Sequence, residues 1–174
     1  MKLLELGILL LVAVVVCGAA ENGIVFDLTR SQQNVFVDEH NNYRRQTNPP
    51  AADMRGISWD SELQDLAEMH AKKCTFEHSN RKSKIPQFPQ VGENIYVGSG
   101  KNVDKVINET TKSWHSEVES YMYKDNSCRD KSICGHYTQL VWAKSFKLGC
   151  AVAKCSYVLF YAITTVIDLP LQDK

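Results

Sequence analysis

Apolar side chains recur at steps of three and four residues along the first part of the chain, which predicts helices facing a core. The first predicted helix covers residues 31–46, with Phe36 and His40 on its buried side. Ser31 is its expected cap, and Pro49-Pro50 lie beyond its end. A histidine on a buried helical stripe is more often a packing residue than a ligand, so we interpret His40 as part of the core.

Two further helices follow the same pattern. A cap before Leu63 starts the second helix, whose apolar face reaches Cys74. The third helix covers about residues 103–121 and places Glu117 at the border of its buried face. His115 lies on the polar side of this helix, and we expect it to be solvated.

The rest of the chain predicts loops, strands and one short helix. Charged residues and prolines indicate a surface loop at 77–92, followed by a short strand at 95–97. A short helix is expected at 135–143 and a strand at 148–154. Residues 157–167 are β-branched and aromatic without alternation, which is typical of a buried strand.

The chain opens with the features of a signal peptide. Met1-Lys2 precede an apolar run at 6–16, and small residues follow up to Ala20. Such a run is too short for a bilayer, which needs about 20 apolar residues. We therefore assign residues 1–20 as a signal peptide and expect a secreted, extracellular protein without a transmembrane anchor.

Composition favours a single domain and argues against a nucleic-acid partner. About 154 residues remain after residue 20, enough for one ordinary core. The chain has 20 basic and 20 acidic residues, and removing Lys2 and Glu5 leaves 19 of each, interspersed along the sequence. Export also makes Asn108 a candidate glycosylation site, because Asn108-Glu109-Thr110 is an acceptor sequence.

Disulfide bonds are expected, because an exported protein folds in an oxidising compartment. Two bridges can form and one thiol is left over, since the mature chain has an odd number of cysteines. They are Cys74, Cys128, Cys134, Cys150 and Cys155.

Four side chains able to bind metal or move protons stand in or beside the later predicted elements. They are His78, Glu93, Glu117 and His136. They make a site only if the fold brings them together, and no H-E-x-x-H signature fixes two ligands on one helical face. Their spacing alone leaves the site undecided.

A more specific signal lies at residues 134–142, Cys-Gly-His-Tyr-Thr-Gln-Leu-Val-Trp. This run resembles the signature of the cysteine-rich secretory, antigen 5 and pathogenesis-related (CAP) superfamily. The resemblance covers about residues 33 to 155, and residues 48–54 and 141–146 look most like the glioma pathogenesis-related-like group. The supporting motifs are His40-Asn41-x-Tyr43-Arg44, Trp59-Asp60-x-x-Leu63, Cys74-x-x-x-His78-Ser79, Gly92-Glu93-Asn94-Ile95, Trp114-x-x-Glu117 and Gly149-Cys150-x-x-x-x-Cys155.

The resemblance implies an α+β fold, a three-layer α-β-α sandwich, with a cleft lined by His78, Glu93, Glu117 and His136. The two histidines would be the ligands of a possible zinc ion, and either carboxylate is a candidate general base. The alternative interpretation is a hydrogen-bonded network that ties the helices to the sheet.

The resemblance also implies the bridges Cys74–Cys155 and Cys128–Cys134. The family partner of Cys150 stands in the last strand, where this chain has no cysteine, so Cys150 is expected to be the thiol left over. We divide the mature chain into a CAP domain at 21–155 and a divergent segment at 156–174. That segment is either a replacement edge strand or an exposed β-prone stretch.

Three functions stay open. The first is a secreted, non-catalytic binding module whose cleft takes a protein receptor or a lipid such as a sterol, since no serine or cysteine nucleophile stands in a recognisable context. The second is a zinc-assisted hydrolase, with His78 and His136 holding the metal and Glu93 or Glu117 as base. The third is a truncated product without independent function.

Overall fold

The computed structural model describes residues 23–79, 85–99, 102–129 and 131–155, and the backbone of residues 160–168. The predicted signal peptide lies outside these residues. The described elements, in chain order, are β1 (Ile24–Val25), α1 (Arg30–Arg45), β2 (Ser58–Trp59), α2 (Ser61–Ala71), β3 (Val91–Ser99), α3 (Val103–Ser116), the 3₁₀ turn η1 (Glu117–Ser120), β4 (Tyr121–Met122), β5 (Ser127–Cys128), α4 (Gly135–Leu140), β6 (Lys147–Cys155) and β7 (Phe160–Asp168).

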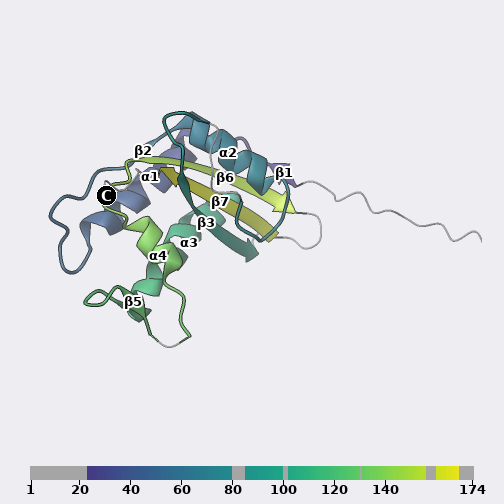
Figure 1. Ribbon diagram of the computed structural model, residues 1–174. Helices are drawn as coiled ribbons and strands as arrows, with labels where there is room; N and C mark the ends of the chain where they lie inside the picture. Colours follow the sequence, from purple (N-terminus) through teal and green to yellow (C-terminus); the bar gives the residue numbers. More distant parts are fainter. Residues whose placement is uncertain (1–22, 80–84, 100–101, 130, 156–159, 169–174) are drawn as a thin grey trace, which may run out of the picture.

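One sheet runs through the middle of the molecule, and its long strands are β6, β7 and β3 in that order (Figure 1). β7 pairs antiparallel with β6 on one side and with β3 on the other. β1 and β2 pair with the other edge of β6, near Ala153 and near Leu148. β7, part of the segment for which an edge strand and an exposed stretch were the two alternatives, is therefore an interior strand. Its β-branched and aromatic sequence suits an interior position, because nothing in it protects an open edge.

Helices cover both faces of the sheet, with α2 on one side and α1 and α3 on the other (Figure 1). β6 contributes to both layers, because alternate residues of a strand point to opposite faces. Leu148, Cys150 and Val152 pack with α1 and α3, whereas Ala151 and Ala153 pack with α2. The structure confirms the predicted α+β class and its three-layer α-β-α sandwich.

The first residues of α2 lie almost against the backbone of β6. A Cβ atom at Gly149 would lie 2.1 Å from the backbone nitrogen of Gln64, so a larger residue does not fit. The sheet and α2 therefore pack closer together at this point than side chains would allow.

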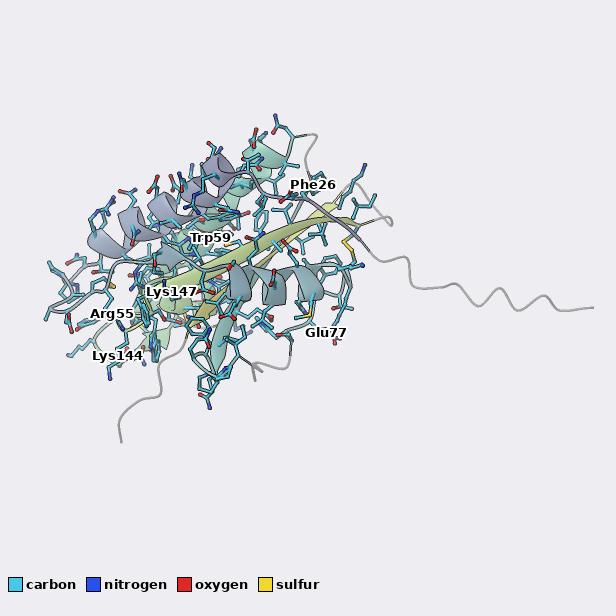
Figure 2. The ribbon with its side chains drawn as sticks, turned by 90° about the horizontal axis from the view of Figure 1, so that it is seen from above. Phe26, Arg55, Trp59, Glu77, Lys144 and Lys147 are labelled. Carbon is cyan, nitrogen blue, oxygen red and sulfur yellow. A yellow bond between two sulfur atoms is a disulfide. The ribbon has the colours of Figure 1, made fainter. Side chains whose placement is uncertain are left out.

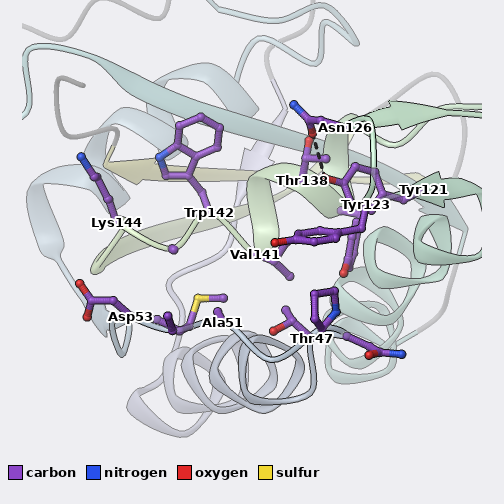
Figure 3. Close-up of a pocket in the computed structure, with 16 residues that line it drawn as sticks. Thr47, Ala51, Asp53, Tyr121, Tyr123, Asn126, Thr138, Val141, Trp142 and Lys144 are labelled. Atoms are coloured by element: carbon purple, nitrogen blue, oxygen red, sulfur yellow. Dashed lines mark hydrogen bonds between the residues drawn. The ribbon is translucent and has the colours of Figure 1, made fainter. Parts of the chain in front are cut away.

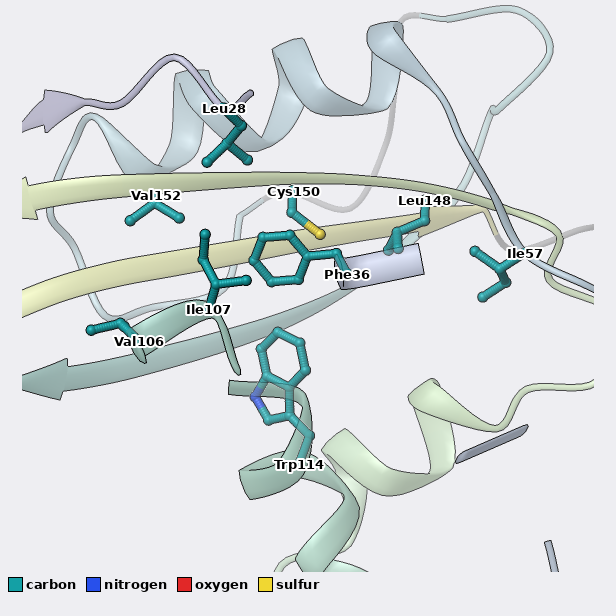
Figure 4. Close-up of a cluster of buried hydrophobic side chains, with 9 residues drawn as sticks. All are labelled: Leu28, Phe36, Ile57, Val106, Ile107, Trp114, Leu148, Cys150 and Val152. Carbon is teal, nitrogen blue, oxygen red and sulfur yellow. The ribbon is translucent and has the colours of Figure 1, made fainter. Parts of the chain in front are cut away.

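The larger core lies between the sheet and the α1–α3 layer and gathers around Phe36 (Figure 4). His40, one turn further along α1, is fully buried, and its Nδ1 lies 2.7 Å from the carbonyl oxygen of Phe36. The Nδ1 donates in this bond, because a carbonyl oxygen only accepts. Burial lowers the pKa of His40 to about 4, so the ring is neutral at physiological pH. The interpretation of His40 as a packing residue is confirmed.

His115 differs from its predicted environment. Its ring stacks on Tyr43 with 4.0 Å between centroids and meets Tyr137 edge-on at 5.8 Å. Burial lowers its pKa below the ordinary value. The prediction of a solvated histidine was wrong because part of the polar side of α3 faces the end of α1 rather than water.

Both expected disulfide bridges are present. Cys74 is joined to Cys155 and Cys128 to Cys134, with 5.8 and 6.0 Å between their Cα atoms. α2 ends before Cys74, which adopts the left-handed conformation with a φ of 52°. Cys150 belongs to neither bridge, and its side chain is buried in the core.

Candidate functional site

The first half of the candidate site is a pair formed by His78 and Glu93. Glu93 lies in β3 with its side chain only 1% exposed, whereas that of His78 is 46% exposed. The carboxylate accepts three hydrogen bonds: from Nδ1 of His78 at 2.9 Å, from the Ser79 backbone nitrogen at 2.8 Å and from the Ser79 hydroxyl at 2.6 Å. A buried carboxylate therefore orients an accessible imidazole.

The second half is a pair formed by His136 and Glu117. α3 ends at Ser116, earlier than predicted, and the tighter turn η1 begins at Glu117. The Glu117 carboxylate accepts from Nδ1 of His136 at 2.5 Å and from the backbone nitrogens of His136 and Tyr137 at 3.0 and 3.1 Å. These N–H groups open α4, where Cys134 supplies no side-chain cap. Glu117 thus caps α4 and orients its histidine at once.

The two pairs share one arrangement. In each, Nδ1 donates to a carboxylate, which leaves Nε2 with its lone pair. No hydrogen bond joins the Nε2 atom of His78 or His136 to a residue that the structure describes. Among the described residues, no group occupies either lone pair.

The pairs meet at a cleft of about 300 Å³ between β3 and α4. His78, Glu93 and His136 line this cleft, while Glu117 supports His136 from outside it. The side-chain amide of Gln139 in α4 packs against Gly92 of β3, where a Cβ atom would lie 2.0 Å from the amide oxygen. The structure thus brings the four predicted residues to one place, three as lining and one as support. No cluster of three or more candidate metal ligands occurs among the described residues.

A larger cavity of about 480 Å³ adjoins the cleft, and Thr138 and Trp142 line both. Figure 3 shows the loop at residues 47–54 facing Val141 and Trp142, with Tyr123 closing one side. The walls are largely aromatic and aliphatic.

Sequence reasoning did not predict the cavity. In the sequence, residues 48–54 and 141–146 indicated only a resemblance to the glioma pathogenesis-related-like group. The available signal was Tyr123, an aromatic residue just beyond the predicted third helix, since it lines the cavity. Loop residues far apart in the chain make up its walls, and periodicity carries no information about how such loops meet.

The segment that joins α4 to β6 is held by Arg44 of α1, which is 1% exposed. Its guanidinium donates to the carbonyl oxygens of Leu140 at 3.0 Å, Trp142 at 2.9 Å and Ser145 at 2.8 Å. It also donates to the carbonyl of Arg55 at 2.8 Å. Arg55 and Lys144 accordingly lie at the same end of the molecule (Figure 2). The position of Trp142 in the cavity wall therefore depends on a buried arginine in another layer.

The fold and the site define the class of protein: an α-β-α sandwich whose cleft holds two histidines, each oriented by a carboxylate. A model of the cysteine-rich secretory protein family, CAP, matches residues 37–167, and the chain belongs to this family. The match runs beyond Cys155 and includes most of β7, whereas the sequence analysis ended the resemblance near residue 155. β7 is thus part of the family domain.

The curated relatives agree with the predicted subgroup. GLIPR1-like protein 1 of Homo sapiens is 42% identical over 123 residues, which cover 68% of this chain and 49% of the relative. Glioma pathogenesis-related protein 1 of Mus musculus is 40% identical over 121 residues, covering 68% of this chain and 46% of the relative. The chain therefore spans about half the length of these relatives.

Solved structures show the same fold. Na-ASP-1 matches with a TM-score of 0.68 and 27% identity, over 80% of this chain and 39% of the other. Schistosoma mansoni venom allergen-like protein 4 matches with a TM-score of 0.68 and 23% identity, over 81% of this chain and 89% of the other. The family is named for secreted proteins, and two disulfides fit that setting. None of the described helices is long and apolar enough to cross a bilayer.

Proposed function

We propose that the protein is an extracellular, non-catalytic binding module that takes an amphipathic lipid, such as a sterol or a fatty acid. The observation that carries this proposal is the cavity of about 480 Å³ beside the cleft, lined by tyrosine, tryptophan and aliphatic side chains. Its volume lies in the range of about 300–1,000 Å³ that small-molecule sites occupy.

The edge of the cavity supplies groups for the polar end of such a ligand. Lys144 and Asp53 lie together at one end (Figure 3). The cleft histidines lie beyond the shared wall at Thr138 and Trp142. A ligand with an apolar body and one polar group finds partners for both parts here.

The state of the carboxylates argues against the hydrolase alternative. Glu93 and Glu117 each accept three hydrogen bonds from the protein, so little capacity remains for accepting a proton from water. Burial alone would raise the pKa of Glu93, but the hydrogen bonds from Ser79 and His78 outweigh it and hold the pKa below its ordinary value. A carboxyl with a lowered pKa is a weak base at neutral pH.

Lipid binding can be tested with a matched pair of exposed apolar residues. Tyr123 is 64% exposed and lines the cavity, whereas Met69 is 59% exposed and lines neither cavity nor cleft. We expect the mature protein to bind a fluorescent sterol or fatty acid at micromolar concentration. Tyr123→Ala should weaken binding about tenfold, or roughly 1.4 kcal/mol, because it removes an aromatic wall. Met69→Ala should leave the affinity unchanged.

Two results would reject this function. The first is that no sterol or fatty acid binds to a protein whose cooperative thermal transition shows that it is folded. The other is equal loss of affinity in the Tyr123 and Met69 variants, which would mean that the probe binds exposed apolar surface without a site. A protein receptor would then become the better candidate partner.

A second candidate function, metal-dependent binding at the cleft, is favoured by the two Nε2 atoms. A histidine that ligates metal usually donates its other ring nitrogen to a carboxylate, which is the arrangement in both pairs. His78 and His136 are therefore the two candidate ligands of a zinc ion, whereas a typical zinc site has three or four protein ligands, a number that no cluster of the described residues reaches. A zinc ion bound there would supply Lewis-acid attraction for an anionic group of the ligand.

Zinc uptake separates a ligand role for the pairs from a purely structural one. In calorimetric titration, Glu93→Gln should weaken zinc binding about 10- to 100-fold, since a carboxylate partner raises the basicity of its histidine. The control is His115→Ala, which removes a histidine outside the cleft and should leave zinc affinity as in the wild type. Absence of zinc uptake by the folded wild-type protein at micromolar concentration would leave the pairs as structural hydrogen bonds that tie residues 78 and 79 to β3 and α4 to η1.

A further inference from the structure

Asn108 is an exposed residue of α3 that neither the cleft nor the cavity uses. It begins the sequence Asn108-Glu109-Thr110, the single Asn-x-Ser/Thr triplet in the chain. Such triplets are acceptors for N-linked glycans and are expected in surface loops. This one lies in the middle of a helix instead.

The helix divides the triplet between two environments. Asn108 and Glu109 are exposed, whereas Thr110 is fully buried. The Thr110 hydroxyl donates to the carbonyl oxygen of Val106 at 2.7 Å, one turn earlier. The Asn108 amide likewise donates to the carbonyl oxygen of Asp104 at 2.9 Å. In the folded protein, an enzyme that must read both the asparagine amide and the threonine hydroxyl can reach only the first.

We propose that Asn108 carries an N-linked glycan and that the glycan is added before α3 packs against the core. In this transfer, the amide nitrogen of Asn108 forms a bond to the anomeric carbon of a lipid-linked oligosaccharide. The bond between that carbon and the pyrophosphate oxygen breaks, the lipid pyrophosphate leaves with the electron pair, and the amide loses one proton. The donor is a dolichol-type oligosaccharide pyrophosphate of the secretory pathway.

The folded structure accommodates the product. The modified amide keeps one N–H group, so the hydrogen bond to Asp104 can persist. Lys105 and Glu109 of the same helix form a solvent-exposed ion pair at 3.7 Å that a glycan can displace at little cost. No residue of α3 lines the cleft or the cavity, so a glycan on this helix leaves both open.

The site is tested by expressing the full chain in mammalian cells and treating it with an N-glycosidase. The wild-type protein should show a mobility shift, and Asn108→Gln should show none. Thr110→Ser keeps an acceptor hydroxyl and should keep the shift, whereas Thr110→Val keeps the shape but should lose it. An unmodified Asn108 in the wild-type chain, whether recovered from the medium or from the cells, overturns the site.

The order of events needs a second assay. Unglycosylated protein, refolded with both bridges, is offered to a solubilised oligosaccharyltransferase together with a lipid-linked donor, beside the same chain reduced and denatured. We expect transfer to the unfolded chain and at least a tenfold slower transfer to the folded one. Equal rates would overturn the inferred order while leaving the site intact.

Discussion

Replacing Arg44 with methionine is expected to lower the free energy of unfolding by about 3–5 kcal/mol, a large share of the 5–15 kcal/mol typical of a domain. Methionine keeps the apolar stem but removes every donor. The carbonyl groups of Leu140, Trp142 and Ser145 would lose their hydrogen bonds to a charged group. Each lost hydrogen bond to a charged group is worth about 1.5–3 kcal/mol, and the Trp142 carbonyl keeps its second bond, from the backbone nitrogen of Ser145 at 3.1 Å. Urea denaturation followed by circular dichroism gives the difference.

The neighbouring arginine provides the control. Arg45 is exposed at the end of α1, so Arg45→Met should change stability by less than about 0.5 kcal/mol. Arg44→Lys should resemble Arg44→Met, because a single ammonium cannot reach the carbonyls that a planar guanidinium spans. If Arg44→Lys were as stable as the wild type, charge alone would explain the role of this residue, and the carbonyl contacts would not matter.

Helix positions could be predicted from the sequence because periodicity reports which residues face a core. α1 and α2 lie close to their predicted ranges, although Thr29 replaces Ser31 as the cap of α1. The predicted third helix was too long, since η1 interrupts it at Glu117. The helix tightens at Glu117, where the side chain contacts His136 of α4. These two residues are 19 positions apart, so a local pattern does not report their contact.

The position of β7 could not be predicted for a similar reason. Its composition indicated a strand, but composition does not say which strands flank it. An interior strand has a partner on each side. β7 pairs with β3 and with β6, so that Ile167 lies opposite both Gly92 and Leu148. Long-range pairing of this kind is not encoded in any local pattern.

The candidate site shows what motifs add to periodicity. His78, Glu93, Glu117 and His136 could be named from the family resemblance, yet their pairing follows from the fold. Ser79 was quoted only as part of a motif, although its backbone nitrogen and hydroxyl supply two of the three hydrogen bonds to Glu93. A serine after a histidine is too common to predict such a role without coordinates.

Removing the Cys74–Cys155 bridge is expected to lower the stability about as much as replacing Arg44. The bridge closes a segment of 81 residues, and the chain-entropy estimate for a loop of this length is about 4.5 kcal/mol. The bridge joins the region after α2 to the end of β6. Its removal therefore frees the α2 layer and the sheet from a covalent link. The double variant Cys74→Ala with Cys155→Ala should therefore unfold at much lower urea concentration than the wild type.

The second bridge is the internal control, because Cys128 and Cys134 are only 6 residues apart. The same estimate gives about 2.2 kcal/mol for so short a loop. The double variant Cys128→Ala with Cys134→Ala should thus lose roughly half as much stability, measured by the same urea titration under non-reducing conditions. Equal losses in the two variants would contradict a loop-entropy origin, and the native contacts around each bridge would then have to account for its contribution.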